Sequence, residues 1–206
     1  MPTTTIHAVR HAQTGFGAEE RYAGTRDVDL SAKGIADALR AREVLAGEHY
    51  DMVLSSPLLR ARRTAELLRP GASLEEDERV VERNYGALEG RTWAEARDFD
   101  PPILFIEVGG EQHSVNPPGA ETFEDVWYRA RAVADDLLGR HAGRRLLLVS
   151  HGTFLQMFIG ALTGSSCIES LAVSPGNLEL TELELSGRDL IRHDTRSLID
   201  EMVGGF

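Results

Sequence analysis

Short apolar runs alternate along the chain with longer amphipathic segments. The short runs are rich in Val, Ile and Leu and predict strands, whereas the longer segments carry apolar residues every three or four positions and predict helices. The predicted strands are residues 4–10, 51–56, 77–82 and 144–152, with a further pair inside 177–195 around a Ser-Gly-Arg-Asp turn. The predicted helices are residues 31–47, 57–71, 120–143 and 153–164. This alternation predicts an α/β fold with a mainly parallel central sheet and helices on both faces.

One segment, residues 98–119, does not follow this alternation. Its prolines and glycines predict a long loop or lid, and its apolar centre predicts that it packs against the rest of the protein. A chain of 206 residues fits one domain of ordinary to large size. We therefore expect a single domain over residues 1–206 with a lid or insert at about 98–119.

The charge balance narrows the classes of partner. The chain has 22 Lys+Arg against 33 Asp+Glu, a net charge of −11, and no long basic stripe. Nucleic acid is therefore not an expected partner, because nothing in the sequence would release phosphate counterions along a helix. A small anionic substrate stays compatible with this balance, since charges beyond about 8 Å are screened and a local group of arginines decides its binding.

Compartment and assembly follow from a few further features. Cys167 is the only cysteine, which fits a reducing cytoplasm, and the N-terminus has no basic leader followed by an apolar core. The longest apolar stretch, "FLQMFIGAL", is too short to span a bilayer. We expect a cytoplasmic protein with no membrane partner. The sequence does not determine the oligomeric state, and a homodimer is compatible with it.

Polar side chains follow three of the predicted strands. Arg10 and His11 end the first strand, His151 ends the strand at 144–152, and Arg60 lies in the first turn of the helix after 51–56. Ligands of parallel sheets bind beyond the carboxyl ends of the strands, so these groups are expected to converge. An arginine and a histidine side by side disfavour each other's positive charge unless an anion lies between them. The spacing predicts a phosphate-handling α/β domain.

These residue types suit phosphoryl transfer. Arg10 and Arg60 can each make a bidentate contact with two phosphate oxygens. By lowering the pKa of a nearby histidine, they also keep that histidine neutral and nucleophilic. A second histidine, if protonated, stabilises charge on the transferring group. Glu82, after the predicted strand 77–82, is the best candidate to protonate the departing oxygen. Each residue also has a plainer interpretation as a surface or structural side chain, the one we give to the other histidines: His7, His49, His113, His141 and His193.

Motifs along nearly the whole chain resemble those of the histidine phosphatase superfamily, the phosphoglycerate mutase-like proteins. They are "VRHAQT", "DVDLSAKGIADA", "VLSSPLLRARRTAELL", "ERNYGALEG", "PPGAETFEDV" and "LLVSHGTF", in the family's order. The resemblance implies that His11 is the phosphorylated nucleophile, that Glu82 is the proton donor and that no metal or cofactor takes part. It implies a phosphate pocket completed by Arg10, Arg60 and His151, and further substrate contacts from Gln13, Thr14, Arg21, Tyr85, Gly152 and Asn177.

The chain departs from the family pattern at a few positions. Ala12 and Gln13 stand where the family has Gly and Glu, and both changes are conservative in size or hydrogen bonding. Gly17 stands where many members carry an asparagine that contacts phosphate, so we expect no contact from that position. Tyr85 and Asn177 match positions near the pocket in some members and are equally compatible with packing roles.

Three functions are compatible with these motifs. We favour a metal-independent phosphomonoesterase acting on a small phosphorylated metabolite through a phosphohistidine. A cofactor-dependent phosphoglycerate mutase-type phosphotransferase is less favoured, because Trp93 stands where mutases carry a lysine and residues 98–119 contain no Lys or Arg. This apolar lid predicts a substrate with an uncharged or hydrophobic body. The third alternative is a non-catalytic phospho-ligand binder, but such proteins typically lose a catalytic residue, and this chain keeps all five.

Overall fold

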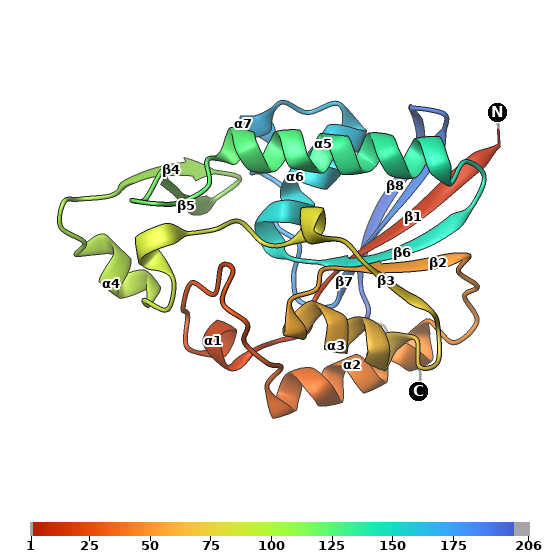
Figure 1. Cartoon of the computed structure of the whole chain (residues 1–206), viewed down its shortest axis with the longest axis horizontal. Helices are drawn as coiled ribbons and strands as arrows, with labels where there is room; N and C mark the ends of the chain where they lie inside the picture. The colour runs from red at the N-terminus through yellow and green to blue at the C-terminus, as the bar shows by residue number, and fades with distance from the viewer. Residues whose placement is uncertain (1, 200–206) are drawn as a thin grey trace.

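The computed structural model describes residues 2–199, in which six strands form one central sheet (Figure 1). Their order across the sheet is β3-β2-β6-β1-β7-β8. The strands are β1 (Thr3–Arg10), β2 (Met52–Ser55), β3 (Leu74–Glu76), β6 (Arg145–Ser150), β7 (Glu179–Ser186) and β8 (Asp189–Ser197). The first four in the sheet run parallel, and β7 and β8 add an antiparallel hairpin at one edge. The predicted α/β fold with a mainly parallel sheet is confirmed.

Helices cover both faces of this sheet. One face carries α5 (Phe123–Arg140), α6 (Gly152–Thr163) and the short α7 (Cys167–Ser170), and the other carries α2 (Ala32–Val44) and α3 (Leu59–Leu68) (Figure 1). Successive side chains of a strand point to opposite faces, so Leu146 and Leu148 join the core under α5 and α6, whereas Leu147 and Val149 join the core under α2 and α3. No helix within residues 2–199 is long and apolar enough to cross a membrane.

The third predicted strand is misplaced in the sequence interpretation. The parallel partner of β2 is β3 at Leu74–Glu76, and the predicted strand 77–82 instead begins with the 3-10 helix η1 (Glu78–Val80). Asp77 explains the difference, because its carboxylate accepts a hydrogen bond from the backbone N–H of Arg79 at 2.8 Å and so starts a helical turn. The helix predicted at 57–71 is also shorter, since α3 begins at Leu59 and ends at Leu68.

The segment predicted as a long loop or lid contains a β-hairpin. Strands β4 (Leu104–Val108) and β5 (Glu111–Val115) pair antiparallel in a sheet of their own and lie beside the short helix α4 (Trp93–Arg97) (Figure 1). The turn is Gly109–Gly110, both with positive φ, and a Gly-Gly pair between two strand-like runs is a hairpin signal. A Cβ on Gly109 would come within 2.7 Å of Ala172 Cα, so the hairpin tip packs closely on the loop after α7.

Candidate active site

The two histidines meet because two parallel strands end side by side. β1 and β6 are in register with Arg10 opposite Ser150, and the His11 N–H donates to the Ser150 carbonyl at 2.9 Å. The next residue of each strand is therefore a histidine at the same sheet edge, with ring centroids 5.1 Å apart. The strand-end convergence predicted from the sequence is present.

Arg60 reaches the same point from α3. It lies in the first turn of the helix and is 1% exposed. Its Nε donates to His11 Nε2 at 3.2 Å, and its two terminal nitrogens donate to the carbonyls of Arg26 and Gly24 at 2.9 and 2.7 Å. Arg10 Nη1 donates to the Pro175 carbonyl at 2.8 Å. Both guanidinium groups are thus fixed by backbone carbonyls, which leaves their charge uncompensated by these contacts.

The ring of His11 is oriented by a hydrogen bond at each of its two nitrogens. Its Nδ1 donates to the carbonyl of Ala12 at 2.8 Å, because a carbonyl can only accept. In the neutral ring Nε2 therefore carries the lone pair, on the side that receives the Arg60 hydrogen bond. Burial lowers the pKa of His11 well below its usual value, and Arg60 and Arg10 lower it further. The sequence interpretation named the arginines as the cause, whereas burial is the larger effect.

The ring of His151 makes an edge-type contact with this ring, and the residue is fully buried. Its Nε2 is 2.8 Å from Ser56 Oγ, and its Nδ1 has no hydrogen-bond partner within the described residues. Burial lowers its pKa well below the usual value, with Arg60, His11 and Arg10 acting in the same direction. His151 is therefore neutral in the free protein, and a bound dianion would favour its protonated form.

Glu82 is held at the start of α6. Its two carboxylate oxygens accept the backbone N–H groups of Thr153 and Phe154, both at 3.3 Å, and one also accepts the Arg83 N–H at 2.8 Å. The N-terminus of a helix favours a negative charge. A Cβ on Gly152 would lie 3.6 Å from the Glu82 carboxylate and 3.5 Å from Arg10 Cζ, so these two side chains face each other across a glycine.

Arg10, His11, Arg60 and Glu82 line one cavity of about 460 Å³, whereas His151, predicted to contact the phosphate, is not among its lining residues and packs against the ring of His11. Of the predicted substrate contacts, the cavity lining includes Thr14, Arg21, Tyr85, Gly152 and Asn177. The amide of Asn177 donates to the His11 carbonyl at 2.7 Å, and the Tyr85 hydroxyl pairs with Thr153 Oγ1 at 2.7 Å. Gln13 does not line it.

Gln13 serves the start of α2 instead. Its side-chain oxygen accepts a hydrogen bond from the Ser31 hydroxyl at 3.1 Å, and its carbonyl accepts the Ser31 N–H at 2.9 Å. Within residues 2–199, no group of three His, Cys, Asp or Glu side chains is arranged to hold a metal ion.

The mouth of the cavity contains residues that the sequence interpretation did not assign to a site. From α4 and the hairpin come Trp93, Arg97, Phe105, Gln112 and His113. His113, predicted to be a surface or structural histidine, lies on β5, packs edge-on against the Phe123 ring and also lines the cavity. The Gly-Gly turn was the signal available in the sequence: it would have placed Phe105 and His113 on the two strands of one hairpin.

Comparison with known proteins identifies the family of this chain. The sequence profile of the histidine phosphatase superfamily (branch 1) matches residues 6–193. A bifunctional protein of Mycobacterium tuberculosis is 31% identical over 194 residues, which cover 92% of this chain and 53% of that protein. The chain therefore spans about half the length of this relative.

Two further relatives represent different activities. A 2,3-bisphosphoglycerate-dependent phosphoglycerate mutase of Methylobacterium radiotolerans is 33% identical over 167 residues, 76% of this chain and 77% of that protein. The structure of a mycobacterial glucosyl-3-phosphoglycerate phosphatase complexed with VO3 matches with a TM-score of 0.77 at 28% identity, covering 94% of this chain and 97% of that one. Both strand-end histidines, Arg10, Arg60 and Glu82 lie within the matched range, residues 6–193. The chain belongs to the histidine phosphatase superfamily.

Proposed function

We propose that this protein is a metal-independent phosphomonoesterase that hydrolyses a small phosphorylated metabolite through a phosphohistidine at His11. One observation carries the proposal. The Ala12 carbonyl holds the His11 Nδ1 proton, which leaves a neutral Nε2 beside two buried or half-buried arginines. A nucleophile and the charges that bind a phosphoryl group are therefore adjacent before any substrate arrives.

The reaction has two steps. In the first, the Nε2 lone pair attacks phosphorus, the ester P–O bond breaks, and the leaving oxygen takes a proton from Glu82. In the second, water attacks the phosphohistidine and gives a proton to Glu82, and the P–N bond breaks with its electron pair returning to Nε2. Arg10, Arg60 and a protonated His151 neutralise the three equatorial oxygens in both steps, so the protein's own cations supply the charge.

The cavity mouth favours hydrolysis over mutase chemistry. A mutase must hold a second anionic group while the intermediate turns over, which requires basic residues facing His11. Here Arg21 is paired with the carboxylate of Glu19 at 2.6 Å, whereas Arg97 contacts only the neutral side-chain oxygen of Gln112 at 3.4 Å and keeps its charge. Trp93 and Phe105 add aromatic surface to the same mouth. The paired Arg21 and the two aromatic side chains support a substrate with an uncharged or apolar body.

Mutase activity is the second candidate, since a relative of 33% identity is named a mutase. A clear preference for bisphosphorylated over singly phosphorylated substrates would favour it over hydrolysis.

The test is phosphate release from an activated aryl phosphate in the presence of a chelator, with wild type beside His11→Ala. We expect turnover in wild type and a loss of roughly 10⁴-fold or more in the variant, the size seen when a catalytic nucleophile is removed. Rapid acid-free quenching should trap a phosphohistidine in wild type alone. Turnover that survives in His11→Ala, or that disappears with the chelator, would contradict the proposal.

A further inference from the structure

The carboxylate proposed as the proton donor lies on a segment with little regular structure. After the 3-10 helix η1, Glu82 belongs to neither a helix nor a strand, and the next helical turn is η2 (Gly86–Leu88). The central sheet fixes His11 and His151, which follow the ends of two of its strands, but it does not fix this segment. Other contacts must therefore hold the Glu82 backbone in place, since a displacement of about 1 Å in a catalytic group can cost about 100-fold in rate.

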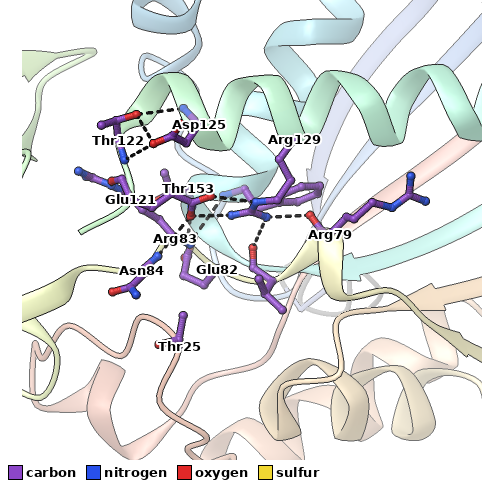
Figure 2. A network of polar contacts seen from close by, with 12 residues as sticks. Thr25, Arg79, Glu82, Arg83, Asn84, Glu121, Thr122, Asp125, Arg129 and Thr153 are labelled. Atoms are coloured by element: carbon purple, nitrogen blue, oxygen red, sulfur yellow. Dashed lines mark hydrogen bonds and ion pairs between the residues drawn. The ribbon is translucent and has the colours of Figure 1, made fainter. Parts of the chain in front are cut away.

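Arg129 of α5 supplies the first of these contacts. Its Nη1 donates to the carbonyls of Arg79 and Val81 at 2.7 and 2.8 Å, so one guanidinium nitrogen holds the backbone on the N-terminal side of Glu82. Figure 2 shows the Arg129 side chain extending from the helix to this segment. The Arg129 side chain is only 16% exposed, and an arginine there has little freedom to move.

Glu121 fixes Arg129 and also holds the other side of Glu82. Its two carboxylate oxygens accept Arg129 Nε and Nη2 at 3.0 and 2.8 Å, a two-point ion pair (Figure 2). Its backbone N–H donates to the Asn84 carbonyl at 2.9 Å, and its carboxylate accepts the Asn84 N–H at 3.4 Å. The segment around Glu82 is therefore held before and after the carboxylate by contacts that begin at one residue.

Arg83 extends the same network to the lid hairpin. It is fully buried, its Nε donates to the Glu121 carbonyl at 2.8 Å, and its Nη1 donates to the Ser114 carbonyl in β5 at 2.9 Å. Its guanidinium lies 3.9 Å from the Phe123 ring centroid, and it forms no ion pair within the described part of the chain. The neighbour of Glu82 is thus bonded both to Glu121 and to a strand that lines the cavity mouth.

We propose that Glu121 is a positioning residue for the proton donor: by fixing Arg129 and Asn84 it sets the place of the Glu82 carboxylate relative to the leaving oxygen. The proposal rests on the proposed function, because it takes Glu82 as the donor. Glu121 lies in the "PPGAETFEDV" motif, 38 residues from Arg83 in sequence, which explains why the sequence alone does not reveal the connection.

The experiment compares kcat/KM for two substrates that differ in their need for a proton. A 4-nitrophenolate leaves without protonation, whereas the alkoxide of a simple alkyl phosphate such as glycerol phosphate requires it. The variants are Glu121→Gln and Arg129→Lys, with Glu82→Gln as the reference for a lost donor. Glu124→Gln is the matched control, since Glu124 is an exposed carboxylate three residues along the same helix start.

We expect Glu82→Gln to lower kcat/KM for the alkyl phosphate by about 100-fold or more and for the aryl phosphate by little. Glu121→Gln and Arg129→Lys should lower kcat/KM for the alkyl phosphate by about tenfold and for the aryl phosphate by little. Glu124→Gln should match wild type on both substrates. Arg129→Lys keeps the charge in place, so it tests the hydrogen-bond geometry even if Glu121→Gln folds poorly.

The outcomes separate the two proposals. In one outcome, Glu82→Gln lowers kcat/KM selectively for the alkyl phosphate, whereas Glu121→Gln and Arg129→Lys lower kcat/KM equally for both substrates or for neither. Glu121 is then only structural, and the inference is wrong while the donor role of Glu82 stands. If Glu82→Gln itself lowers kcat/KM equally for both substrates, the donor role of Glu82 is wrong, and the inference about Glu121 is wrong as well. Selective losses in all three variants support both.

Discussion

The two ends of the cavity are built in different ways. At the phosphate end, His11 is 7% exposed and Arg60 is 1% exposed, and both are held by backbone carbonyls next to strand or helix ends. At the mouth, Trp93 is 51% exposed, and Phe105 and Gln112 come from a hairpin that is not part of the central sheet. The buried end is suited to one reaction, whereas the exposed end can change its side chains without disturbing the core.

This difference in burial and contacts indicates which residues of the cavity set substrate selectivity. Residues of the phosphate end contact one another, so the loss of one leaves the others with unpaired buried groups. Residues of the mouth make fewer such contacts: Arg97 has one weak hydrogen bond to Gln112 at 3.4 Å among the contacts described. We therefore expect substitutions at the phosphate end to lower activity on every substrate, and substitutions at the mouth to change the order of preference among substrates.

Of the three substitutions that test this comparison, Arg60→Lys is expected to have the largest effect. Lysine keeps the positive charge but cannot make the three contacts of the guanidinium to His11, Gly24 and Arg26. Removing a positioned donor to the transferring group typically costs about 10²–10³ in rate. Steady-state assays on aryl and alkyl phosphates should show a loss of this size on both.

The control for Arg60→Lys is Arg62→Lys. Arg62 lies on the same helix, its side chain is 41% exposed, and its nearest carboxylate, Glu76, is 3.9 Å away, so its replacement should change activity less than twofold. A loss in Arg60→Lys confined to one substrate would contradict the view that the phosphate end is indifferent to the leaving group.

The sequence predicted the phosphate end better than the mouth, for a physical reason. Parallel strands end at one edge, so His11 and His151 were expected to meet from their positions alone, and the register of Arg10 with Ser150 brings them together. The position of Glu82 cannot be predicted from a strand end in this way. The sequence predicted a strand that leads directly to Glu82, but the actual strand, β3, ends at Glu76. Its assignment came from the motif resemblance, and its actual position depends on Arg129, a residue whose helical spacing looks like that of any surface arginine.

The mouth was harder to predict because its fold depends on local turn chemistry. Prolines on both sides of residues 104–115 favoured a loop interpretation, yet Gly109 and Gly110 form a tight turn between paired strands. Contacts of the hairpin with distant segments, such as the Ser174 hydroxyl donating to Glu111, involve residues that no local pattern connects. The position of His113 beside the cavity was not predicted for this reason.

A smaller effect is expected from Trp93→Ala at the mouth. The indole is half-exposed in the free protein, and a substrate body that packs on it would bury the rest. Losing about 1.4 kcal/mol of apolar contact corresponds to a tenfold higher KM for aromatic or apolar phosphomonoesters. Inhibition by inorganic phosphate should stay within twofold of wild type, because phosphate contacts only the buried end. Equal weakening of phosphate and of large substrates would show that the two ends are not independent.

The smallest effect is expected from Gly17→Asn, which introduces at the phosphate end the asparagine that the motif resemblance implies for many family members. Gly17 lies in the short helix α1 (Gly15–Ala18) and lines the cavity, and a Cβ there would meet only Thr14 Oγ1 at 3.4 Å, so an asparagine fits without a backbone clash. One added hydrogen bond to phosphate is worth about 0.5–1 kcal/mol net, which corresponds to a two- to fivefold lower inhibition constant for inorganic phosphate. Because the contact is to the phosphate itself, kcat/KM should rise by a similar factor on aryl and alkyl substrates alike.

Gly15→Asn is the control, since a Cβ at Gly15 meets nothing within 4 Å and that residue does not line the cavity. An unchanged inhibition constant in Gly17→Asn would mean that this position faces the mouth rather than the phosphate, and the boundary between the two ends would then lie nearer to His11.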